Sequence, residues 1–263
     1  MTASDEVWAD RIADALGRAF LAWMGQSGRA QGVDGDDVLW MAGVPDFPLF
    51  NAVLATGRTV DLDALDRAEQ SLSEHEPLHR LSTRAAVEPV VGPWAAAHGY
   101  GEGEPTPSLV LSGDGFTACL TAAAAGTRTR RAQPSEAAAF NDAAAGVFGL
   151  PAERIRMLTP DSLAVHPQST LRIAVVDDRI VGTAQAWTEG EAIGVFNVAV
   201  VPEHRRTGLG AELTAAVVAD GAAVGGTWAY LQSSDDGLPV YERLGFRTVD
   251  TWWSWMPQGS DDH

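Results

Sequence analysis

The feature that most constrains this chain is a strand that runs through a glycine loop into a helix, over residues 196–211. The apolar, β-branched run before Pro202 predicts a buried strand, which the proline ends because it has no N–H to donate to a neighbouring strand. After Gly208 and Gly210, apolar residues recur at helical spacing, which predicts a helix that begins near Thr207. A strand, a loop and a helix in this order favour an α/β fold.

This junction has the chemistry of an anion site. The first turn of a helix leaves backbone N–H groups without partners, and the helix dipole adds partial positive charge there. Glycines let the backbone approach a ligand closely, and Arg205 and Arg206 add charge at the mouth of the loop. A pyrophosphate suits such a site. A P-loop is excluded because Ala211 and Glu212 stand where Lys and Ser or Thr are needed, and a dinucleotide fingerprint needs a third glycine.

Two motifs narrow the ligand further. The pattern Arg205-x-x-Gly208-x-Gly210 follows a strand and Val-Pro-Glu, and Tyr241-Glu-Arg-Leu-Gly-Phe246 comes downstream of it. Together they closely resemble the acyl-coenzyme A (acyl-CoA) signature and the Y-x-x-x-G-F element of the GNAT superfamily of acyltransferases. The resemblance implies the GNAT fold, a mixed and mostly antiparallel sheet flanked by helices. It also implies acetyl-CoA, or another acyl-CoA, as the co-substrate.

The same resemblance implies a role for each matching residue. The strand before the loop is expected to splay from its neighbour, so that backbone groups of Val198, Ala199 and Val200 hold the pantetheine and the thioester. The pyrophosphate is expected on the loop, mostly on backbone N–H groups of Arg205, Arg206, Thr207, Gly208, Leu209, Gly210 and Ala211. Tyr241 matches the tyrosine that protonates the departing thiolate, and a phenol with an ordinary pKa of about 10 is protonated at neutral pH.

The sequence departs from the family pattern at the coenzyme contact and leaves the general base open. Ser234 occupies the coenzyme-contacting position that many members fill with asparagine, and serine is shorter and offers fewer hydrogen bonds. Asn197 on the signature strand cannot act as a base. The alternatives are a water chain to backbone carbonyls or one of four side chains, Glu189, Glu191, His166 and His204. The six histidines show no metal-binding spacing, which predicts no metal.

The bulk composition argues against several classes of protein. A formal net charge of −17 disfavours general nucleic-acid binding and attraction to anionic membranes, both of which depend on Lys and Arg. Cys119 is the single cysteine and lies in an Ala-rich stretch, which predicts a buried thiol and no intrachain disulfide. The N-terminus lacks signal-peptide features and no apolar run reaches the ~18 residues of a membrane helix, so we expect a cytoplasmic protein.

The two halves of the chain echo each other. From Thr127 the expected order is strand, helix, strands, the signature strand, helix, strand, helix and strand, which gives a mixed α/β sheet flanked by helices. In the first half, Trp94-Ala-Ala-Ala-His-Gly-Tyr100 precedes a strand and parallels the Tyr241–Phe246 element. This similarity favours two copies of the fold in tandem.

The predicted domain boundary lies in a Gly-, Ala- and Thr-rich linker at residues 112–126. We therefore predict a degenerate GNAT-like domain over residues 1–115 and a GNAT acetyltransferase domain over residues 116–263. No Arg-x-x-Gly-x-Gly occurs between residues 38 and 112, so the first copy should bind no coenzyme.

Two functions are compatible with these observations. The first is an acyl-CoA-dependent N-acyltransferase that transfers an acetyl group to a small-molecule amine directly, in a ternary complex. The alternative is a coenzyme A-binding or regulatory module without turnover, which the open position of the base and the serine at position 234 favour. Release of thiol from acetyl-CoA in the presence of amines would distinguish them.

Overall fold

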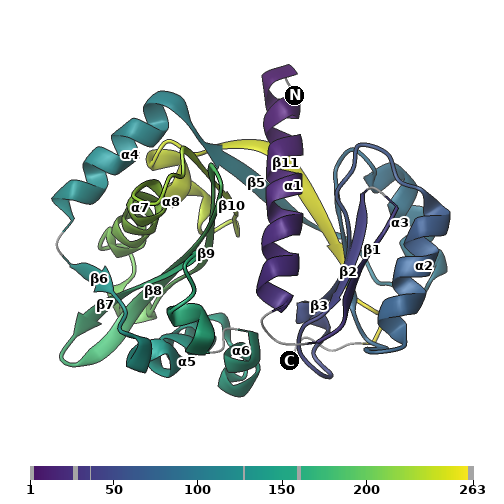
Figure 1. The fold of residues 1–263 in the computed structure, drawn as a ribbon, viewed down its shortest axis with the longest axis horizontal. Coiled ribbons are helices and arrows are strands. Elements are labelled where there is room, and N and C mark those ends of the chain that lie inside the picture. The colour runs from purple at the N-terminus through teal and green to yellow at the C-terminus, as the bar shows by residue number, and fades with distance from the viewer. Residues whose placement is uncertain (1–2, 26–28, 36, 127, 159–160, 260–263) are drawn as a thin grey trace. The chain divides into compact units, whose positions relative to one another are not determined.

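The computed structural model describes residues 3–25, 29–35, 37–126, 128–158 and 161–259. The chain divides into two compact units (Figure 1). Unit 1 comprises Met1–Ser108 and Thr248–His263, and unit 2 comprises Leu109–Arg247. The chain passes between the units in strand β5 (Glu104–Leu111) and at the start of strand β11 (Arg247–Trp255), so the last strand of the chain belongs to unit 1.

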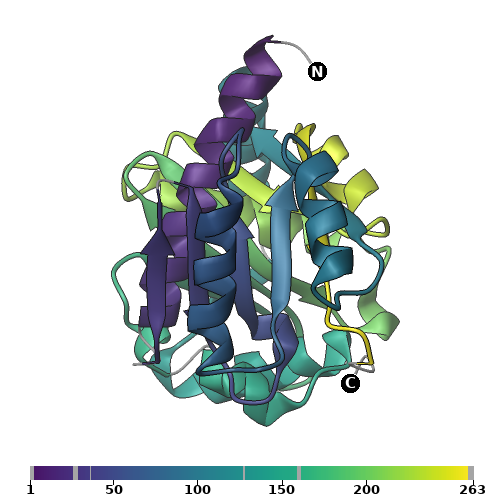
Figure 2. The same cartoon turned by 90° about the vertical axis from the view of Figure 1, so that its right-hand side faces the viewer.

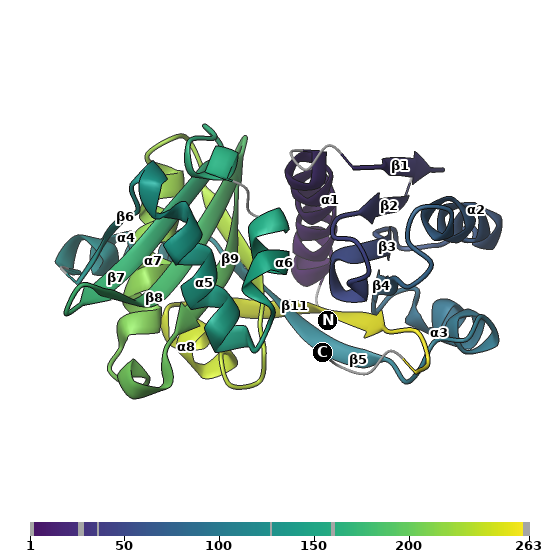
Figure 3. The ribbon, with the colours of Figure 1, turned by 90° about the horizontal axis from the view of Figure 1, so that it is seen from below.

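Unit 1 is a sheet with helices on both faces (Figures 2 and 3). Its elements are α1 (Ala3–Gly25), β1 (Gln31–Asp34), β2 (Val38–Ala42), a 3-10 turn (Pro48–Phe50), β3 (Asn51–Ala55), α2 (Leu62–Ser73), β4 (Arg80–Arg84) and α3 (Glu88–Ala97). The strand order is β1-β2-β3-β4-β11. Helix α1 packs Gly17 against Leu39 of β2, whereas α2 buries Leu65 and Leu72 in a core that contains Leu81 of β4. The spacing of the buried residues of α2 is that of an amphipathic helix.

In unit 2 the strands follow the order β10-β9-β8-β7-β6. Its elements are α4 (Gly113–Ala125), β6 (Thr129–Arg131), a 3-10 turn (Pro134–Glu136), α5 (Ala137–Phe148), α6 (Ala152–Leu158), a 3-10 turn (Asp161–Ala164), β7 (Ser169–Val176), β8 (Arg179–Glu189), β9 (Ala192–Val200), a 3-10 turn (Pro202–His204), α7 (Leu209–Ala222), β10 (Trp228–Gln232) and α8 (Leu238–Arg243). Helix α7 covers one face, where Gly221 lies against Ile193 of β9, and α5 packs on the other. Leu209, Leu213 and Val217 of α7 build the main core of the unit with strand residues such as Val195.

The two units repeat one order of elements, which confirms the predicted fold class. In each, three antiparallel strands (β1-β2-β3 and β7-β8-β9) lead into a helix (α2 or α7), and the next strand pairs parallel to the third (β4 with β3, β10 with β9). A short helix (α3 or α8) and a last strand (β5 or β11) follow. The sheets are mixed and mostly antiparallel, as expected for two GNAT-type copies in tandem.

The linker interpretation of residues 112–126 is wrong, because Gly113–Ala125 form helix α4, which packs against α7. Alanine is the strongest helix former, and this stretch is rich in it beyond its two early glycines. Phe116 and Cys119 are its buried residues. The expected domains, residues 1–115 and 116–263, are contiguous copies and stay a prediction, whereas the compact units place the last strand of the chain with the first copy.

Several properties of the described residues concern the kinds of protein and of site that the sequence argues against. None of their helices is both long and apolar enough to cross a lipid bilayer. The same residues contain no group of three or more His, Cys, Asp or Glu side chains that could hold a metal ion. Cys119 is 1% exposed, as predicted, and its burial raises the pKa of the thiol to about 11, which keeps it un-ionised at neutral pH.

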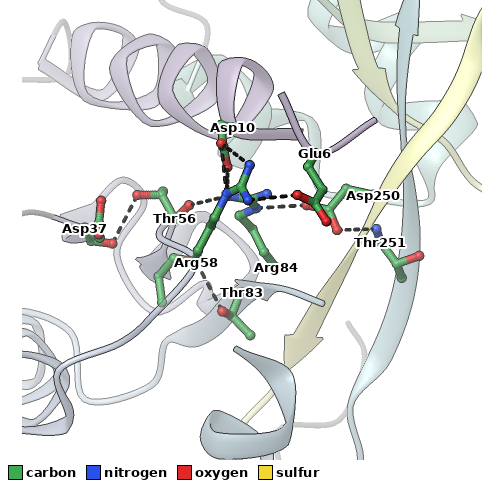
Figure 4. A network of polar contacts seen from close by, with 10 residues as sticks. Glu6, Asp10, Asp37, Thr56, Arg58, Thr83, Arg84, Asp250 and Thr251 are labelled. Carbon is green, nitrogen blue, oxygen red and sulfur yellow. Dashed lines mark hydrogen bonds and ion pairs between the residues drawn. The ribbon is translucent and has the colours of Figure 1, made fainter. Parts of the chain in front are cut away.

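A buried ion pair in unit 1 centres on Arg84 of β4 (Figure 4). Its Nε donates to Asp250 of β11 at 2.9 Å, and its Nη1 donates to Asp10 of α1 at 2.8 Å. The side chains of Arg84 and Asp250 are only 4% and 3% exposed. Asp10 also accepts from Arg58 at the surface, and the hydrogen bonds from Arg58 and then Arg84 lower its pKa. The stability that Asp10 contributes is therefore present above its ordinary pKa of 3.8 and is lost as the pH falls through the lowered value.

Replacing Arg84 with methionine is expected to lower the free energy of unfolding of unit 1 by about 3–5 kcal/mol, because the Asp250 carboxylate then stays buried without its partner. Urea denaturation at neutral pH, followed by tryptophan fluorescence, measures the loss. Arg58→Met breaks only exposed pairs and serves as the control, with a small expected effect. Equal losses in the two variants would contradict this assignment.

Candidate functional site

The centre of the candidate site is the place where β9 and β10 separate. These parallel strands pair at only three positions, of which Tyr230 with Gly194 is the last. Both strands continue beyond that pair, β10 to Gln232 and β9 to Val200. The backbone groups on this side of β9, including those of Val198, Ala199 and Val200, therefore have no partner strand in β10. The structure thus contains the splay that the resemblance implied.

A β-bulge lies in the splayed part of β9. Gln185 of β8 pairs with Phe196, but Thr183, two residues earlier, pairs with Ala199, three residues on, so β9 contains one extra residue. Asn197 lies in this bulge with φ +51°. Asparagine tolerates this left-handed conformation better than most residues, and bulges re-aim the residues that follow. The bulge therefore sets the direction of the Val198 backbone groups.

The loop after β9 has an unusual backbone conformation and leaves a run of N–H groups without partners. Arg206 has φ +59° and Gly208 has φ +82°, and α7 begins at Leu209. The first intrahelical hydrogen bond runs from the N–H of Glu212 to the carbonyl of Gly208. Among the described residues, the N–H groups of residues 206–211 have no hydrogen-bond partner. Six free donors at the N-terminus of a helix are suited to an anion.

Three arginines surround this loop, and the structure gives them different tasks. Arg205 donates from Nε to the carbonyl of Val200 at 3.0 Å and so ties the loop to the end of β9. Arg206 is exposed, and within the described part of the chain its guanidinium makes no ion pair or hydrogen bond. Arg128 donates to the carbonyl of Thr207 at 3.1 Å and to Glu212 at 2.7 Å. Arg206 is therefore the cation best placed for a phosphate, and Arg128 holds the loop.

Tyr241 lies on α8, directly after the end of β10. Its ring is half-buried, makes an edge contact with Phe246 at 5.9 Å between centroids, and lies beside Gly237, next to the serines that follow β10. Helix α8 packs against α7. Burial raises the pKa of the phenol to about 12, and its hydroxyl makes no hydrogen bond to any described residue. The hydroxyl is therefore a protonated donor at neutral pH.

Ser234 lies in the turn that precedes α8. Its Oγ accepts from the N–H of Gly237 at 3.3 Å, and its carbonyl accepts from Leu238 at 3.0 Å. The exposed side chain lies at the end of β10. This hydroxyl stabilises the turn that precedes α8, and a contact with the coenzyme stays a prediction.

The side chains weighed as general bases lie apart from the bulge. Glu189 ends β8 and Glu191 precedes β9, so both belong to the turn at the end of β9 opposite to the glycine loop. His166 stacks on Trp187 of β8 at 4.9 Å between centroids. His204 lies in the 3-10 turn that precedes the loop, where its carbonyl accepts from Thr207 at 2.8 Å. These positions favour none of the four over a water chain.

Unit 1 lacks the features of this site. Strands β3 and β4 pair over four positions up to Ala55, the last residue of β3, so they do not splay. At the start of α2, the carboxylate of Asp61 accepts from the N–H of Asp63 at 3.0 Å. The helix N-terminus thus carries its own anion. The loop arginine, Arg58, pairs with Asp10 and Glu6.

Sequence reasoning missed two parts of the site. The bulge at Asn197 leaves no signal in an apolar strand pattern, although an asparagine within such a run is a weak indication. The support from Arg128 depends on a contact between residues 79 positions apart in the sequence.

Comparison with known proteins agrees with this geometry. Residues 167–248 match the family model of the acetyltransferase (GNAT) domain, and they contain β9, the glycine loop, α7 and Tyr241. No curated protein matches the sequence significantly.

Three solved structures have a similar fold. A GCN5-related N-acetyltransferase from Kribbella flavida is 21% identical, covers 96% of each chain and has a TM-score of 0.65. One from Sphaerobacter thermophilus is 16% identical over 94% of this chain and 92% of that chain, with a TM-score of 0.57. A tandem GNAT protein from the clavulanic acid biosynthesis pathway is 16% identical over 86% and 80% of the two chains, with a TM-score of 0.53. At these identities the likeness concerns the fold alone.

Proposed function

Because the chain contains an acetyltransferase domain of the GNAT superfamily over residues 167–248, we propose that it is an acyl-CoA-dependent N-acyltransferase. Its proposed donor is acetyl-CoA and its proposed acceptor is a small-molecule amine. The observation that carries the proposal is the splay of β9 from β10 after Gly194, followed directly by six unpartnered N–H groups at residues 206–211 within the described chain. We also propose that the protein works in the cytoplasm, without general nucleic-acid binding.

In this proposal the loop binds the pyrophosphate, and the splayed strand holds the rest of the coenzyme. Backbone N–H groups of residues 206–211 and the Arg206 guanidinium supply charge-assisted hydrogen bonds. The open edge of β9 at Val198–Val200 offers its backbone groups to the pantetheine and to the thioester carbonyl. Such donors stabilise the negative charge that develops on that oxygen during transfer.

The proposed reaction is a direct transfer. The amine nitrogen attacks the thioester carbonyl, the C–S bond breaks, and the departing thiolate takes the proton of the Tyr241 hydroxyl. The amine loses its proton to water, which backbone carbonyls of β9 beyond its last pair with β10 can hold in place. No carboxylate is required on the strand in this scheme, which agrees with the presence of Asn197 in the bulge.

Thiol release from acetyl-CoA over a panel of primary amines tests this function. We expect release that depends on one class of amine, with a product heavier by one acetyl group. Tight coenzyme binding without thiol release for any acceptor would instead favour the alternative, a coenzyme A-binding or regulatory module. The hydrogen bond of the Ser234 hydroxyl within the turn before α8 is the observation that favours the alternative.

Calorimetric titration with coenzyme A is expected to give one binding site per chain, because β3 and β4 of unit 1 do not splay and the carboxylate of Asp61 occupies the N-terminus of α2. The variant Asp61→Ser makes the test stricter, because it removes the anion at the N-terminus of α2. This variant should still bind one coenzyme per chain, since β3 and β4 remain paired. Two equivalent sites in the parent protein would contradict the assignment of a degenerate copy.

A further inference from the structure

The bulge of β9 is held by side chains of the neighbouring strand. Asn197 donates from Nδ2 to Oε1 of Gln185 at 2.8 Å, and Thr183 donates from Oγ1 to the backbone carbonyl of Asn197 at 2.9 Å. Gln185 and Thr183 are both 0% exposed. We call Thr183, Gln185 and Asn197 the clasp. Within it, Gln185 binds the side chain of the bulge residue Asn197, and Thr183 binds its backbone carbonyl.

The clasp is built into an otherwise apolar layer. Gln185 pairs with Leu171 of β7 and Thr183 pairs with Ile173, and these two apolar residues form a core with Phe140 of α5. The amide nitrogen of Gln185 reaches Ser169 of β7 at 3.4 Å, so both ends of the amide have partners. Buried polar groups persist in a core only when they are satisfied, and a satisfied network fixes one arrangement of the backbone. Here the arrangement that is fixed is the left-handed conformation of Asn197.

We propose that Thr183, Gln185 and Asn197 are positioning residues for acyl transfer, an inference that rests on the proposed function. Val198 follows Asn197 in the bulge, and its backbone groups are among those expected at the pantetheine and the thioester. The clasp holds these groups in the direction needed when charge develops on the carbonyl oxygen. None of the three side chains needs to touch the substrate for this role.

The position of the clasp predicts a particular kinetic signature. The pyrophosphate site at residues 206–211 lies beyond the end of β9, and Arg205 anchors the loop independently through Val200. Loosening the clasp should therefore leave coenzyme binding nearly intact and misalign only the thioester. An interaction that is made chiefly in the transition state appears in kcat, whereas one made equally in the ground state appears in KM.

The test compares Thr183→Val and Gln185→Met with the matched control Thr188→Val. Thr188 is a buried threonine on the same strand, beyond the bulge. We expect each clasp variant to lower kcat by about 10–100-fold with the KM for acetyl-CoA within about twofold of the parent. The control should keep the kcat of the parent. A third variant, Asn197→Gly, accepts the positive φ but lacks the amide, and should fold normally and also lose kcat.

The outcomes that would overturn the inference are definite. The inference is overturned if the clasp variants fold and keep the kcat of Thr188→Val. It is also overturned if their only change is a raised KM for acetyl-CoA. If Gln185→Met fails to fold, the kcat values of Thr183→Val and Asn197→Gly decide whether the clasp positions the thioester. Amide hydrogen exchange at residues 196–200 gives a readout without turnover: it should be faster in Thr183→Val than in Thr188→Val, and equal rates would overturn the clasp. A parent protein that releases no thiol would contradict the proposed function instead.

Discussion

Replacing Tyr241 with phenylalanine is expected to slow acetyl transfer by about 10²–10⁴-fold, the usual effect of removing a general acid. The burial that raises the pKa of this phenol to about 12 keeps it protonated across the neutral range, so it has a proton to give when the thiolate departs. Its hydroxyl makes no hydrogen bond to the described residues, and phenylalanine keeps the ring contact with Phe246. Stability and coenzyme affinity should therefore change little. Initial rates of thiol release, measured with saturating acceptor, show the effect.

Tyr100→Phe is the matched control for this substitution. Tyr100 is a buried tyrosine in unit 1, and burial also raises its pKa, but β3 and β4 of unit 1 stay paired to the last residue of β3. This variant should keep the parent rate. An unchanged rate in Tyr241→Phe, under conditions in which chemistry limits turnover, would leave Tyr241 as a packing residue.

Replacing Gly208 with valine is expected to weaken coenzyme A binding by about 10²–10⁴-fold. Gly208 has φ +82°, which a β-branched residue rarely adopts, although the space around a new Cβ is open, with Arg128 at 3.7 Å as the nearest atom. The effect therefore comes from the backbone, which must turn away and carry the N–H groups of the loop with it. The loss of about two charge-assisted hydrogen bonds at ~1.5–3 kcal/mol each accounts for the magnitude. Calorimetry measures it.

Gly225→Val tests whether the loss is specific to the loop. Gly225 follows the other end of α7, has φ +111° and has open space around a new Cβ. The substitution should strain the backbone in the same way and leave coenzyme affinity unchanged. Parent-like affinity in Gly208→Val, or an equal loss in both variants, would contradict the loop as the phosphate site.

The local part of the site could be predicted from the sequence, because its signals are local. An apolar run ended by Pro202, two glycines and a helical pattern lie within sixteen residues, and each has a direct structural meaning. The helix of Tyr241 was predicted for the same reason, with Pro239 suited to its first turn. The tandem order of elements was predicted only from a faint repeat, and the structure confirms it.

The non-local part could not be predicted. The pairing of β11 with β4 joins Trp252 to Arg84, a register that no sequence pattern specifies, and it places the last strand of the chain in unit 1. Helix α4 was taken for a linker because its Gly-, Ala- and Thr-rich composition hides a helix that packing against α7 supports. The clasp depends on contacts across strands between side chains that look like ordinary polar residues in the sequence.

Amide hydrogen exchange with and without coenzyme A tests the central claim most directly, that the loop of unit 2 is an acyl-CoA site. The N–H groups of residues 206–211 have no partners in the described chain, so they should exchange fast in the free protein. The account predicts that coenzyme A slows exchange there and along Val198–Val200, and leaves residues 56–61 of unit 1 unchanged. Unchanged exchange at residues 206–211 under saturating coenzyme A, or protection confined to unit 1, would contradict it.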